Sequence, residues 1–424
     1  MDLPYGRTAS PDPGPQARYE SSPVPSPGAI GPEPPTSHVG LLDLGLRDLL
    51  RRRFAGAPLR FAFAGGAEIY RGSAAPRATV VLRDRATLLR MLLDPDAGFG
   101  EAYAHGDIEV RGDLVAALAS AYRALARADD HAVHAAPSRE HSIPVSRTNA
   151  RRHYDIGNDF YRLWLDDQMV YTCAYFPTPG ASLEEAQAAK LDLVCRKLEL
   201  RPGERVAEAG CGWGALALHM ARRYGVEVRA WNVSKEQVRY ARERAAREGL
   251  ARQVEFVEDD YRAITGRFDA FVSLGMLEHV GPENYAALGA VIDDCLDPER
   301  GRGLLHFIGR TRGRALSRWV RRRIFPGAYA PTLSEAVAGV LEPWNLSVIH
   351  IENLREHYAR TLAHWRARFD RSADVVDACH GEEFTRAWRL YLAGSEAAFR
   401  TGSLHLFQVL FARDARMSAP GSAS

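Results

Sequence analysis

Apolar residues follow two different patterns along the chain, and each pattern predicts a folded region. In the first region, short segments in which apolar and polar residues alternate lie at 59–64, 68–71 and 79–83. Amphipathic or helical spacing of apolar residues occurs at 39–54, 86–93 and 113–126. Alternation is typical of half-buried strands, whereas spacings of three and four are typical of helices. We therefore predict a small α+β domain over residues 38–126.

The second region, residues 151–416, alternates apolar strands with helices. Predicted strands lie at 205–209, 226–233, 254–258, 269–274 and 303–309, and predicted helices at 214–223, 235–248 and 283–295. Alternation of this kind indicates a parallel sheet that helices cover on both faces. We predict an α/β fold with a doubly wound, Rossmann-like sheet. The late apolar segments 346–351 and 404–411 are candidates for its edge.

Three further segments lack apolar periodicity. Residues 1–37 are rich in proline, glycine and serine, residues 127–150 are polar and broken, and residues 417–424 are small and polar. Such compositions cannot bury enough apolar surface to fold. We expect a disordered tail at each end and a linker between the two domains.

Composition excludes several classes of protein. The net charge of +2 is too small to indicate a nucleic-acid partner, and 46% hydrophobic with 25% charged residues is ordinary for a soluble globular protein. No apolar run reaches the length of a membrane span, and the N-terminus lacks the apolar core of a signal peptide. We therefore expect a cytoplasmic protein. Nearly all basic residues are arginine, and lysine occurs only at positions 190, 197 and 235.

The five cysteines are scattered and lack metal-ligand spacing, at positions 173, 195, 211, 295 and 379. This pattern favours a reducing compartment and predicts no metal site. Cys195 and Cys295 lie in apolar helical patterns, so we expect both thiols to be buried.

Residues 206–214, VAEAGCGWG, are the most informative stretch of the chain. A short apolar strand runs into a glycine turn, and an Ala/Leu-rich helical pattern follows. This arrangement builds a nucleotide-like site at the first crossover of a doubly wound sheet. The spacing E-x-G-x-G-x-G is tighter than that of dinucleotide binders, and it suits a cofactor with a ribose and an amino-acid moiety, such as S-adenosylmethionine. The cofactor-binding residues predicted here are Glu208, Gly210, Gly212 and Gly214.

Further polar residues follow the next strands, at the sheet edge where ligands bind. Asn232 and Gln237 are expected beside the cofactor ribose, although Ser234 with Gln237 equally forms a helix N-cap. Asp260 and Tyr261 are expected near the adenine. Asp259 and Asp260 are two adjacent acids in a loop, and such acids are more often merely solvated.

Two residues, one just after a predicted strand and one within a predicted strand, could carry acid–base chemistry. Glu278 follows a strand at the ligand-binding edge, where it is either a functional acid or a helix N-terminal acid favoured by the helix dipole. His306 lies in the apolar strand 304–309, where a lone histidine is usually a core residue. The aromatic segment 171–176 around Cys173 is too apolar for a solvated loop, so we expect it to cover a site.

Six segments, in chain order, resemble the cyclopropane-fatty-acyl-phospholipid synthases and the related mycolic acid cyclopropane synthases. They are HYDIGNDFY, YTCAYF, EAGCGWG, GMLEHVG, LLHFIG and IFPG. The resemblance covers about residues 150–412 and implies the class I methyltransferase fold, and the small domain looks like the amino-terminal domain of the phospholipid-acting members. HYDIGN and YTCAYF are specific to this group, whereas EAGCGWG and MLEHVG occur across class I methyltransferases.

The family's reaction explains several of these residue types. An alkene is a poor nucleophile, so the family holds the sulfonium of S-adenosylmethionine in line with a cis double bond of a membrane phospholipid. A bound bicarbonate ion then takes a proton from the new methyl group in a dry pocket. By resemblance, the residues that hold bicarbonate are Cys173, Glu278, His306, the backbone of Ile308, and Tyr358. Tyr171 and Thr172 join the cofactor-binding residues in the same way.

The chain departs from the family at three positions. Thr172 stands where many relatives have serine, which keeps the hydroxyl group. Ser395 stands where some relatives carry a cysteine, so no catalytic role is carried over to it. Asp259 replaces a commoner glutamine, which leaves the adenine contact open.

The basic segment 310–326 is the candidate for membrane contact. Its arginines interleave with apolar residues that include Trp319, which suits the surface of an anionic bilayer. A solvated helix face with an ordinary buried stripe is the alternative. We expect transient binding at the inner face of the membrane, and a homodimer by analogy only.

The sequence thus predicts an S-adenosylmethionine-dependent C-methyltransferase that forms cyclopropane rings on unsaturated acyl chains of phospholipids. Three alternatives remain: a methylene- or methyl-branched product from the same substrate, N-methylation of a small amine, and a lipid-binding protein with a relic cofactor fold. A dry acyl tunnel would favour the lipid. An acid beside the methyl donor without a tunnel would favour the amine.

Overall fold

The computed structural model describes residues 57–63, 68–69, 75–94, 96–128, 156–313 and 316–413, with a few single positions between 45 and 54. The predicted tails at 1–37 and 417–424 lie outside these residues, as do nearly all of the predicted linker and most of segment 39–54. All of these described residues belong to one compact unit. The boundary between two domains therefore stays a prediction, and we call residues 57–128 the amino-terminal region.

A seven-stranded sheet forms the centre of residues 156–413, in the order β10-β11-β9-β8-β5-β6-β7. Its strands are β5 (Arg205–Ala209), β6 (Glu227–Asn232), β7 (Val254–Glu258), β8 (Ala270–Leu274), β9 (Arg302–Gly309), β10 (Ser347–Asn353) and β11 (His405–Ala412). The strands from β9 to β7 run parallel, and β11 lies antiparallel between β9 and β10. The predicted α/β fold is confirmed, and the two late apolar segments extend one side of the sheet.

Helices cover both faces of this sheet. On one face, apolar strand residues pack against α7 (Leu183–Lys197), α8 (Ala215–Tyr224) and α9 (Lys235–Arg247). On the other face they pack against α11 (Tyr285–Cys295) and the π-helical turn η3 (Val337–Leu341). Burial on both faces explains the near-continuous apolar runs of the parallel strands. Cys195 and Cys295 are buried in these layers, as predicted.

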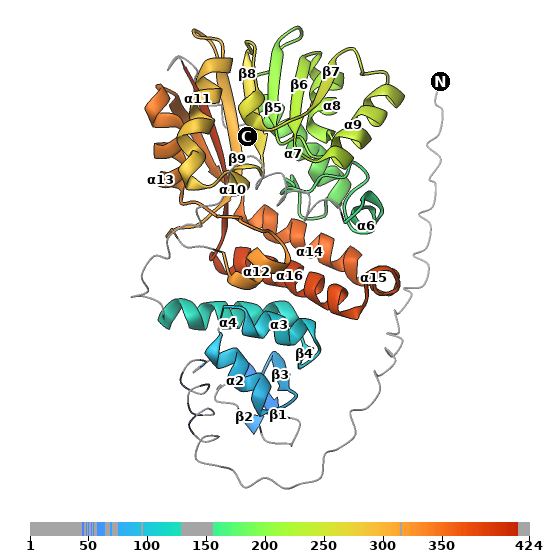
Figure 1. The fold of residues 1–424 in the computed structure, drawn as a ribbon, viewed down its shortest axis with the longest axis vertical. Helices are drawn as coiled ribbons and strands as arrows, with labels where there is room; N and C mark the ends of the chain where they lie inside the picture. Colours follow the sequence, from blue (N-terminus) through green and yellow to red (C-terminus); the bar gives the residue numbers. More distant parts are fainter. Residues whose placement is uncertain are drawn as a thin grey trace, which may run out of the picture. The chain divides into compact units, whose positions relative to one another are not determined.

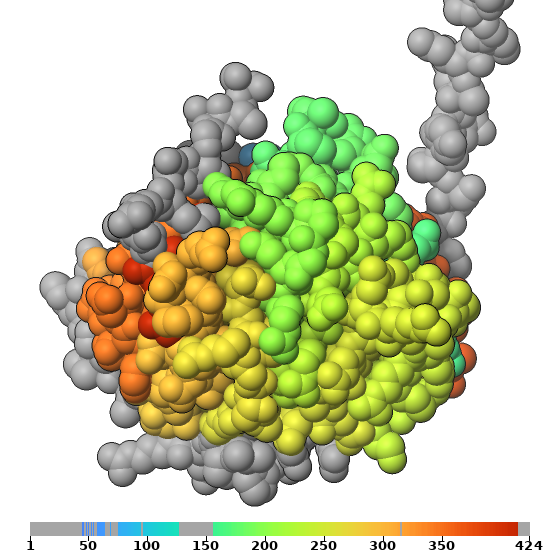
Figure 2. Space-filling model, turned by 90° about the horizontal axis from the view of Figure 1, so that it is seen from above, coloured from blue at the N-terminus to red at the C-terminus, as the bar shows by residue number. Residues whose placement is uncertain are grey.

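Short elements connect these layers. They are α6 (Asn158–Arg162), α10 (Leu277–Val280), α12 (Arg318–Arg323), α13 (Leu333–Ala336), η1 (Tyr261–Ala263), η2 (Pro282–Asn284) and η4 (Glu342–Trp344). Seen from above in Figure 2, the green and yellow segments that carry α8, α9 and α11 form most of the visible surface.

The amino-terminal region contains its own sheet, in the order β2-β1-β3-β4. Its elements are β1 (Leu59–Phe63), β2 (Glu68–Ile69), β3 (Ala78–Leu82), α2 (Arg85–Leu93), α3 (Gly98–Ala104), β4 (Ile108–Gly112) and α4 (Leu114–Ala128). The sequence patterns did not predict α3 or β4. Helix α3 contains glycines because a Cβ at Gly100 would lie 2.4 Å from the ring of Trp319. Close packing therefore overrides the low helix propensity of glycine there.

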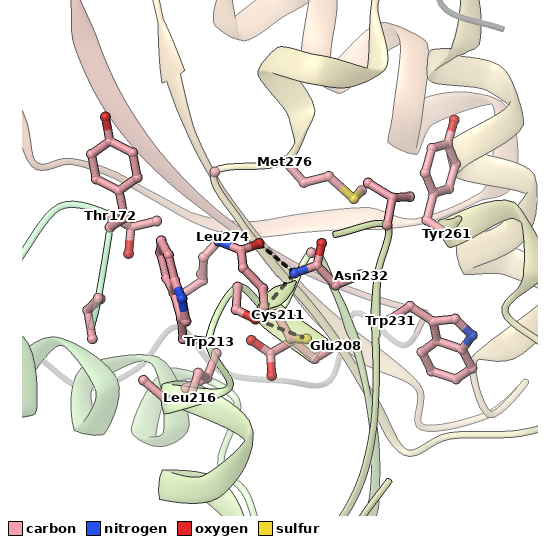
Figure 3. Close-up of a pocket in the computed structure, with 18 of the residues that line it drawn as sticks. Thr172, Glu208, Cys211, Trp213, Leu216, Trp231, Asn232, Tyr261, Leu274 and Met276 are labelled. Carbon is pink, nitrogen blue, oxygen red and sulfur yellow. Dashed lines mark hydrogen bonds between the residues drawn. The ribbon is translucent and has the colours of Figure 1, made fainter. Parts of the chain in front are cut away.

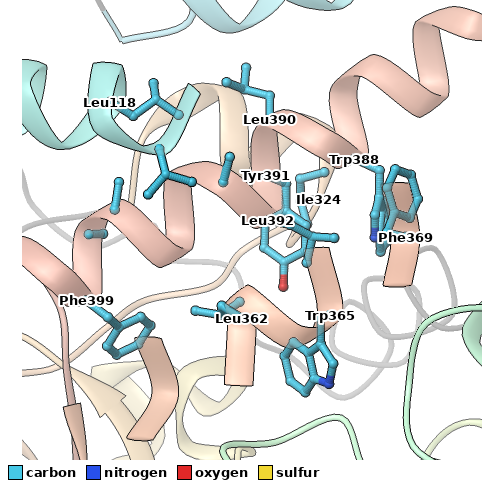
Figure 4. Packing of buried hydrophobic residues seen from close by; sticks show 14 of the residues in the cluster. Leu118, Ile324, Leu362, Trp365, Phe369, Trp388, Leu390, Tyr391, Leu392 and Phe399 are labelled. Atoms are coloured by element: carbon cyan, nitrogen blue, oxygen red, sulfur yellow. The ribbon is translucent and has the colours of Figure 1, made fainter. Parts of the chain in front are cut away.

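Three helices lie between β10 and β11, namely α14 (Arg355–Arg371), α15 (Ala373–His380) and α16 (Glu382–Thr401). Helix α16 contacts α14 and also α3 and α4 of the amino-terminal region (Figure 1). Arg386 of α16 donates hydrogen bonds to the carbonyl oxygens of Tyr103 at 2.7 Å and Ile108 at 2.8 Å. Figure 4 shows Leu118 of α4 lying near Leu390 in the same apolar cluster.

The basic segment 310–326 packs against the amino-terminal region. Trp319 is only 5% exposed, and the Arg318 guanidinium lies 2.6 Å from the Asp94 carboxylate. Arg323 pairs with both Glu101 and Glu383. The prediction of an interfacial tryptophan was wrong, because the indole fills the space above glycine-containing α3. In the part of the chain that the structure describes, no helix is long and apolar enough to cross a bilayer.

Candidate active site

The glycine turn lies at the carboxyl end of β5 and leads directly into α8. Gly210 and Gly212 have φ angles of 82° and 54°, a conformation that L-residues rarely adopt. The amides of Gly210 and Cys211 donate to the carbonyl oxygen of Trp231, at 2.9 and 3.2 Å. The turn is therefore fixed to the end of β6, and a Cβ on Gly212 would point into open space.

A pocket opens beside this turn, and we call it the cofactor pocket (Figure 3). It brings together nine of the ten predicted cofactor-binding residues: Tyr171, Thr172, Glu208, Gly210, Gly212, Asn232, Gln237, Asp260 and Tyr261. The tenth, Gly214, does not line it. A Cβ on Gly214 would lie 2.6 Å from the ring of Phe256, so this glycine serves the packing of α8 on the sheet.

Asn232 and Gln237 hold each other at the end of β6. The Asn232 amide donates to the Gln237 side-chain oxygen at 2.8 Å and to the carbonyl oxygen of Gly212 at 3.2 Å. Ser234 also accepts a hydrogen bond from the Gln237 backbone amide, as the helix cap of α9. The helix cap is therefore confirmed, and the contact of Asn232 and Gln237 with a ribose stays a prediction.

Asp260 and Tyr261 close the pocket after β7. The Asp260 carboxylate is buried and accepts hydrogen bonds from the backbone and side chain of Arg262. Asp259, the position that departs from the family, also lines the pocket and accepts a hydrogen bond from the Asp260 amide.

A buried lysine in the pocket wall, Lys190, was not predicted from the sequence. Lys190 of α7 is fully buried, and its ammonium donates to the Thr172 hydroxyl at 2.8 Å. Burial lowers the pKa of Lys190 to about 8 and raises the pKa of Glu208 to about 8, while each charge favours the ionised form of the other. Because Lys190 can only donate, the Thr172 hydroxyl proton must point elsewhere. Lys190 thus orients a hydroxyl that lines the pocket.

A second, larger cavity of about 1100 Å³ adjoins the cofactor pocket. Its wall includes all five residues that the family resemblance assigned to bicarbonate: Cys173, Glu278, His306, Ile308 and Tyr358. We call these five the base cradle. Tyr171, Thr172, Gly275 and His279 line both spaces, so the two spaces meet at these residues.

Glu278 of α10 is buried against β9. One carboxylate oxygen accepts the backbone amide of Ile308 at 2.6 Å. Burial raises the pKa of Glu278 to about 7, because the charged form is desolvated. The Ile308 amide, predicted to face an anion, therefore contacts Glu278 in this structure.

His306 of β9 is held from behind by two residues that the sequence did not reveal. The Lys197 ammonium donates to the Gln408 side-chain oxygen at 2.6 Å, which fixes the orientation of the amide. The Gln408 nitrogen lies 3.1 Å from Nδ1 of His306 and donates to it. Burial pushes the pKa of His306 well below its usual value. A neutral His306 therefore carries its proton on Nε2.

Four side-chain atoms in these sites are left without hydrogen-bond partners among the described residues. They are Oε2 of Glu208, the hydroxyl oxygen of Tyr261, Oε2 of Glu278 and Nε2 of His306, and all are buried. An unpaired buried polar atom costs about 1–3 kcal/mol. These atoms are therefore positions at which a polar ligand would restore hydrogen bonds.

Cys173 and Tyr358 complete the base cradle. Burial raises the pKa of the Cys173 thiol, and its Sγ donates to the carbonyl oxygen of Ala174 at 3.1 Å. The thiol is thus a protonated group and not a nucleophile. Tyr358 of α14 is 7% exposed and packs against the ring of Phe399, with 4.5 Å between ring centroids.

The aromatic segment 171–176 covers the junction of the two spaces, as predicted from its composition. Tyr171 packs against Trp164 and Trp365, and its hydroxyl lies 2.9 Å from that of Tyr391. Asn158 of the HYDIGN segment accepts a hydrogen bond from the Trp213 indole at 2.7 Å. His153 and Asp155 of that segment lie outside the described residues.

Lys190, Lys197 and Gln408 were missed because none lies in a recognisable motif. One signal was available: the chain uses lysine at only three positions, and two of these are the buried Lys190 and Lys197. Gln408 gave no signal, since it faces His306 only through the antiparallel register of β11 and β9.

The parallel sheet, the glycine turn and the pocket at its carboxyl edge define a class I S-adenosylmethionine-dependent methyltransferase. The chain belongs to the family described as mycolic acid cyclopropane synthetase, whose profile matches residues 141–409. Residues 46–128 match a domain of unknown function (DUF7884).

Individual relatives agree with this assignment. The chain is 36% identical to a probable fatty acid methyltransferase from Pseudomonas putida, over 83% of this chain and 91% of the relative. It is 39% identical to the cyclopropane-fatty-acyl-phospholipid synthase of Escherichia coli K12, over 62% of this chain and 67% of the relative. The solved structure of the cyclopropane synthase MmaA2 from Mycobacterium tuberculosis matches with a TM-score of 0.60 and 30% identity, over 63% of this chain and 98% of that one.

Proposed function

We propose that this enzyme transfers a methylene group from S-adenosylmethionine to the cis double bond of an unsaturated acyl chain in a membrane phospholipid, forming a cyclopropane ring. The observation that carries the proposal is the junction of the two spaces. A cofactor pocket meets a large cavity at Tyr171, Thr172, Gly275 and His279, and the cavity holds the base cradle.

The cofactor pocket fits S-adenosylmethionine by its donors and acceptors. The unpaired Oε2 of Glu208 would accept from the cofactor's amino group, and Asn232 with Gln237 would contact the ribose hydroxyls. Asp260 and Tyr261 would lie at the adenine, with the turn at Gly210 and Gly212 leaving space for the chain between them. When bound, the cofactor supplies an electrophilic methyl group on a sulfonium.

The base cradle fits bicarbonate in the same way. Oε2 of Glu278 would accept the ion's O–H, while the Nε2–H of His306 and the Tyr358 hydroxyl would donate to its oxygens. When bound, bicarbonate supplies the base for the last proton transfer. The pKa of about 7 makes Glu278 a proton acceptor matched to neutral pH.

The large cavity supports an alkene substrate. Apolar, buried side chains from α14 and α16, such as Leu362, Leu390 and Phe399, form part of its wall. In the proposed reaction, the methyl carbon bonds to one alkene carbon as the sulfonium leaves as a thioether. The resulting carbocation loses a proton from the new methyl group, and the electron pair closes the ring. Water would trap that cation, so exclusion of water protects the product.

Location and assembly belong to the same proposal. We infer that the enzyme works in the cytoplasm and binds the anionic inner face of the membrane transiently, since its substrate lies there. The exposed Arg312 and Arg322 of the basic segment would face lipid phosphates, while Trp319 stays buried. A homodimer is also proposed, and light scattering of the purified chain tests it.

The test is product analysis. The purified protein is incubated with methyl-labelled S-adenosylmethionine and vesicles of a cis-monounsaturated phospholipid, and the acyl chains are examined by gas chromatography and NMR. Upfield cyclopropane protons carrying the label are expected. Recovery of all the label in unreacted cofactor, with correctly folded protein, would contradict the proposal.

A methylene- or methyl-branched acyl chain is the second candidate product. The match to a probable fatty acid methyltransferase over 83% of the chain favours it. The same NMR spectrum separates the two, because an exocyclic methylene gives olefinic protons and a branch gives a methyl doublet. Methylation of a small amine is less well supported, since the cavity of about 1100 Å³ is much larger than such a substrate needs.

A further inference from the structure

The amino-terminal region lines the same cavity as the base cradle. Helix α4 contributes one face of the helix to the wall, which consists of Ala117, Leu118, Ala121, Tyr122, Leu125 and Ala126. Strands β1 and β3 contribute Phe61 and Val80. The cavity therefore continues from the proposed reaction centre into the core of the region that matches a domain of unknown function.

Helix α16 joins the two parts of this wall. Its residues Leu390, Gly394 and Ala398 line the cavity, and the helix packs against α4. A Cβ on Gly394 would lie 3.3 Å from the Tyr122 hydroxyl, so the two helices approach closely at that point. Because residues of α4, of α16 and of the base cradle line one cavity, the part beside α4 is continuous with the part that contains the base cradle.

The size and polarity of the cavity indicate the class of ligand that fits it. Its volume of about 1100 Å³ lies above the range of about 300–1,000 Å³ that is usual for small-molecule pockets. Most of the wall contributed by α4, β1 and β3 is apolar, whereas Arg310, Arg312 and Arg321 line the cavity together on one segment. One large cavity whose wall is apolar beside α4, β1 and β3 and cationic at Arg310, Arg312 and Arg321 matches a lipid that combines acyl chains with a phosphate.

We propose that the amino-terminal region binds the second acyl chain of the phospholipid whose first chain reacts. The enzyme takes up both tails of a diacyl lipid, one at the base cradle and one against α4. This inference rests on the proposed function, and it assigns a ligand to a region outside the methyltransferase fold.

A substitution on the cavity face of α4 tests the proposal. Ala121→Phe adds a ring to the wall, and Ala124→Phe on the same helix, at a partly exposed position outside the wall, is the matched control. Rates of ring formation are compared for dioleoyl phosphatidylglycerol and mono-oleoyl lysophosphatidylglycerol, each in carrier vesicles of saturated phosphatidylcholine. Thermal unfolding confirms that both variants fold.

We expect Ala121→Phe to lower kcat/KM for the diacyl lipid about tenfold or more, because an overfilled apolar site rejects its ligand. The rate on the single-chain lipid should stay close to that of the wild type, and Ala124→Phe should change neither. An equal loss on both lipids, or no loss on either, would overturn the proposal.

A second measurement does not depend on turnover. Wild-type protein is photolysed with a phosphatidylglycerol that carries one oleoyl chain and one saturated chain with a terminal diazirine. Label is expected on the peptide that contains α4, and label confined to residues 156–413 would contradict the proposal. If no lipid gives a ring but α4 is labelled, the proposed reaction fails while the two-chain site stands.

Discussion

The cofactor pocket and the base cradle lie in two adjoining spaces that share four lining residues, yet they are built in opposite ways. The polar wall of the cofactor pocket comes mainly from one stretch of chain, Glu208 to Tyr261, at the ends of β5, β6 and β7. The base cradle takes residues from segments at 173, 278, 306–308 and 358, far apart in sequence. The polar residues of the cofactor pocket can thus come from one continuous stretch of chain. The residues of the base cradle come together only when the whole region folds.

The two sites also differ in what holds their side chains. Asn232 and Gln237 are paired with each other in the pocket wall, and Asp260 accepts hydrogen bonds from Arg262 outside it. Glu278 and His306 each use one polar atom for support, and their second polar atoms, like Oε2 of Glu208 in the cofactor pocket, are buried without a partner among the described residues. The difference teaches that changes in the cradle should affect turnover, and changes in the pocket should affect cofactor affinity.

The largest expected effect is that of Glu278→Gln. Turnover should fall by about 10²–10⁴-fold, because the base loses its proton acceptor. Binding of S-adenosylmethionine, measured by calorimetry, should change little. Glu283→Gln, an exposed acid on η2, is the matched control. Wild-type turnover in Glu278→Gln would remove this residue from the mechanism.

Substitutions at Gln408 distinguish a role in orienting His306 from a role in packing alone. Gln408→Leu should lower kcat about 10–100-fold with unchanged cofactor affinity, as for other groups that orient a functional histidine. Gln408→Glu keeps the size and the bond to Lys197, but its carboxylate accepts a hydrogen bond from Nδ1–H, and the neutral ring then has no Nε2–H donor. We expect it to be as slow as the leucine variant. Full activity in Gln408→Glu would break the assignment of the tautomer.

A substitution at Lys190 tests the comparison at the cofactor pocket. Lys190→Met should weaken S-adenosylmethionine binding about tenfold, because the Thr172 hydroxyl loses its donor and Glu208 its counter-charge. Turnover at saturating cofactor should change less than the affinity does. Lys235→Met, at an exposed lysine on α9, is the control. Loss of turnover at unchanged affinity would place Lys190 with the cradle instead.

The smallest expected effect is on stability. The folded protein raises the pKa of Glu278 from 4.5 to about 7, so it binds this proton more tightly than the unfolded chain does. That contribution is present below pH 4.5 and is lost as the pH rises through 7. Glu278→Gln cannot lose a proton, so it should unfold like the wild type at pH 5 and be more stable at pH 8, by about 1–3 kcal/mol. Denaturant melts at both pH values measure this, and equal stability at pH 8 would argue against a buried, strained carboxylate.

Much of the fold could be predicted from the sequence because its strands are short apolar runs separated by helical periodicity. The glycine turn was predictable because its backbone angles demand glycine. Helix α3 was not predicted because packing against Trp319, and not helix propensity, explains the glycine in its sequence. Gln408 was not predicted because only the pairing of β11 with β9 brings it to His306. Trp319 was wrongly predicted to lie at the membrane surface, because a basic amphipathic pattern does not reveal what its apolar residues pack against.

The base cradle is the centre of this account, and bicarbonate dependence tests it most directly. Ring formation is measured in carbon-dioxide-free buffer, with bicarbonate added back in steps, for the wild type and Tyr358→Phe. We predict that the wild-type rate falls when bicarbonate is removed and returns when it is restored, and that Tyr358→Phe needs more bicarbonate to recover. A wild-type rate that does not depend on bicarbonate would contradict the assignment of these residues as the cradle of the base.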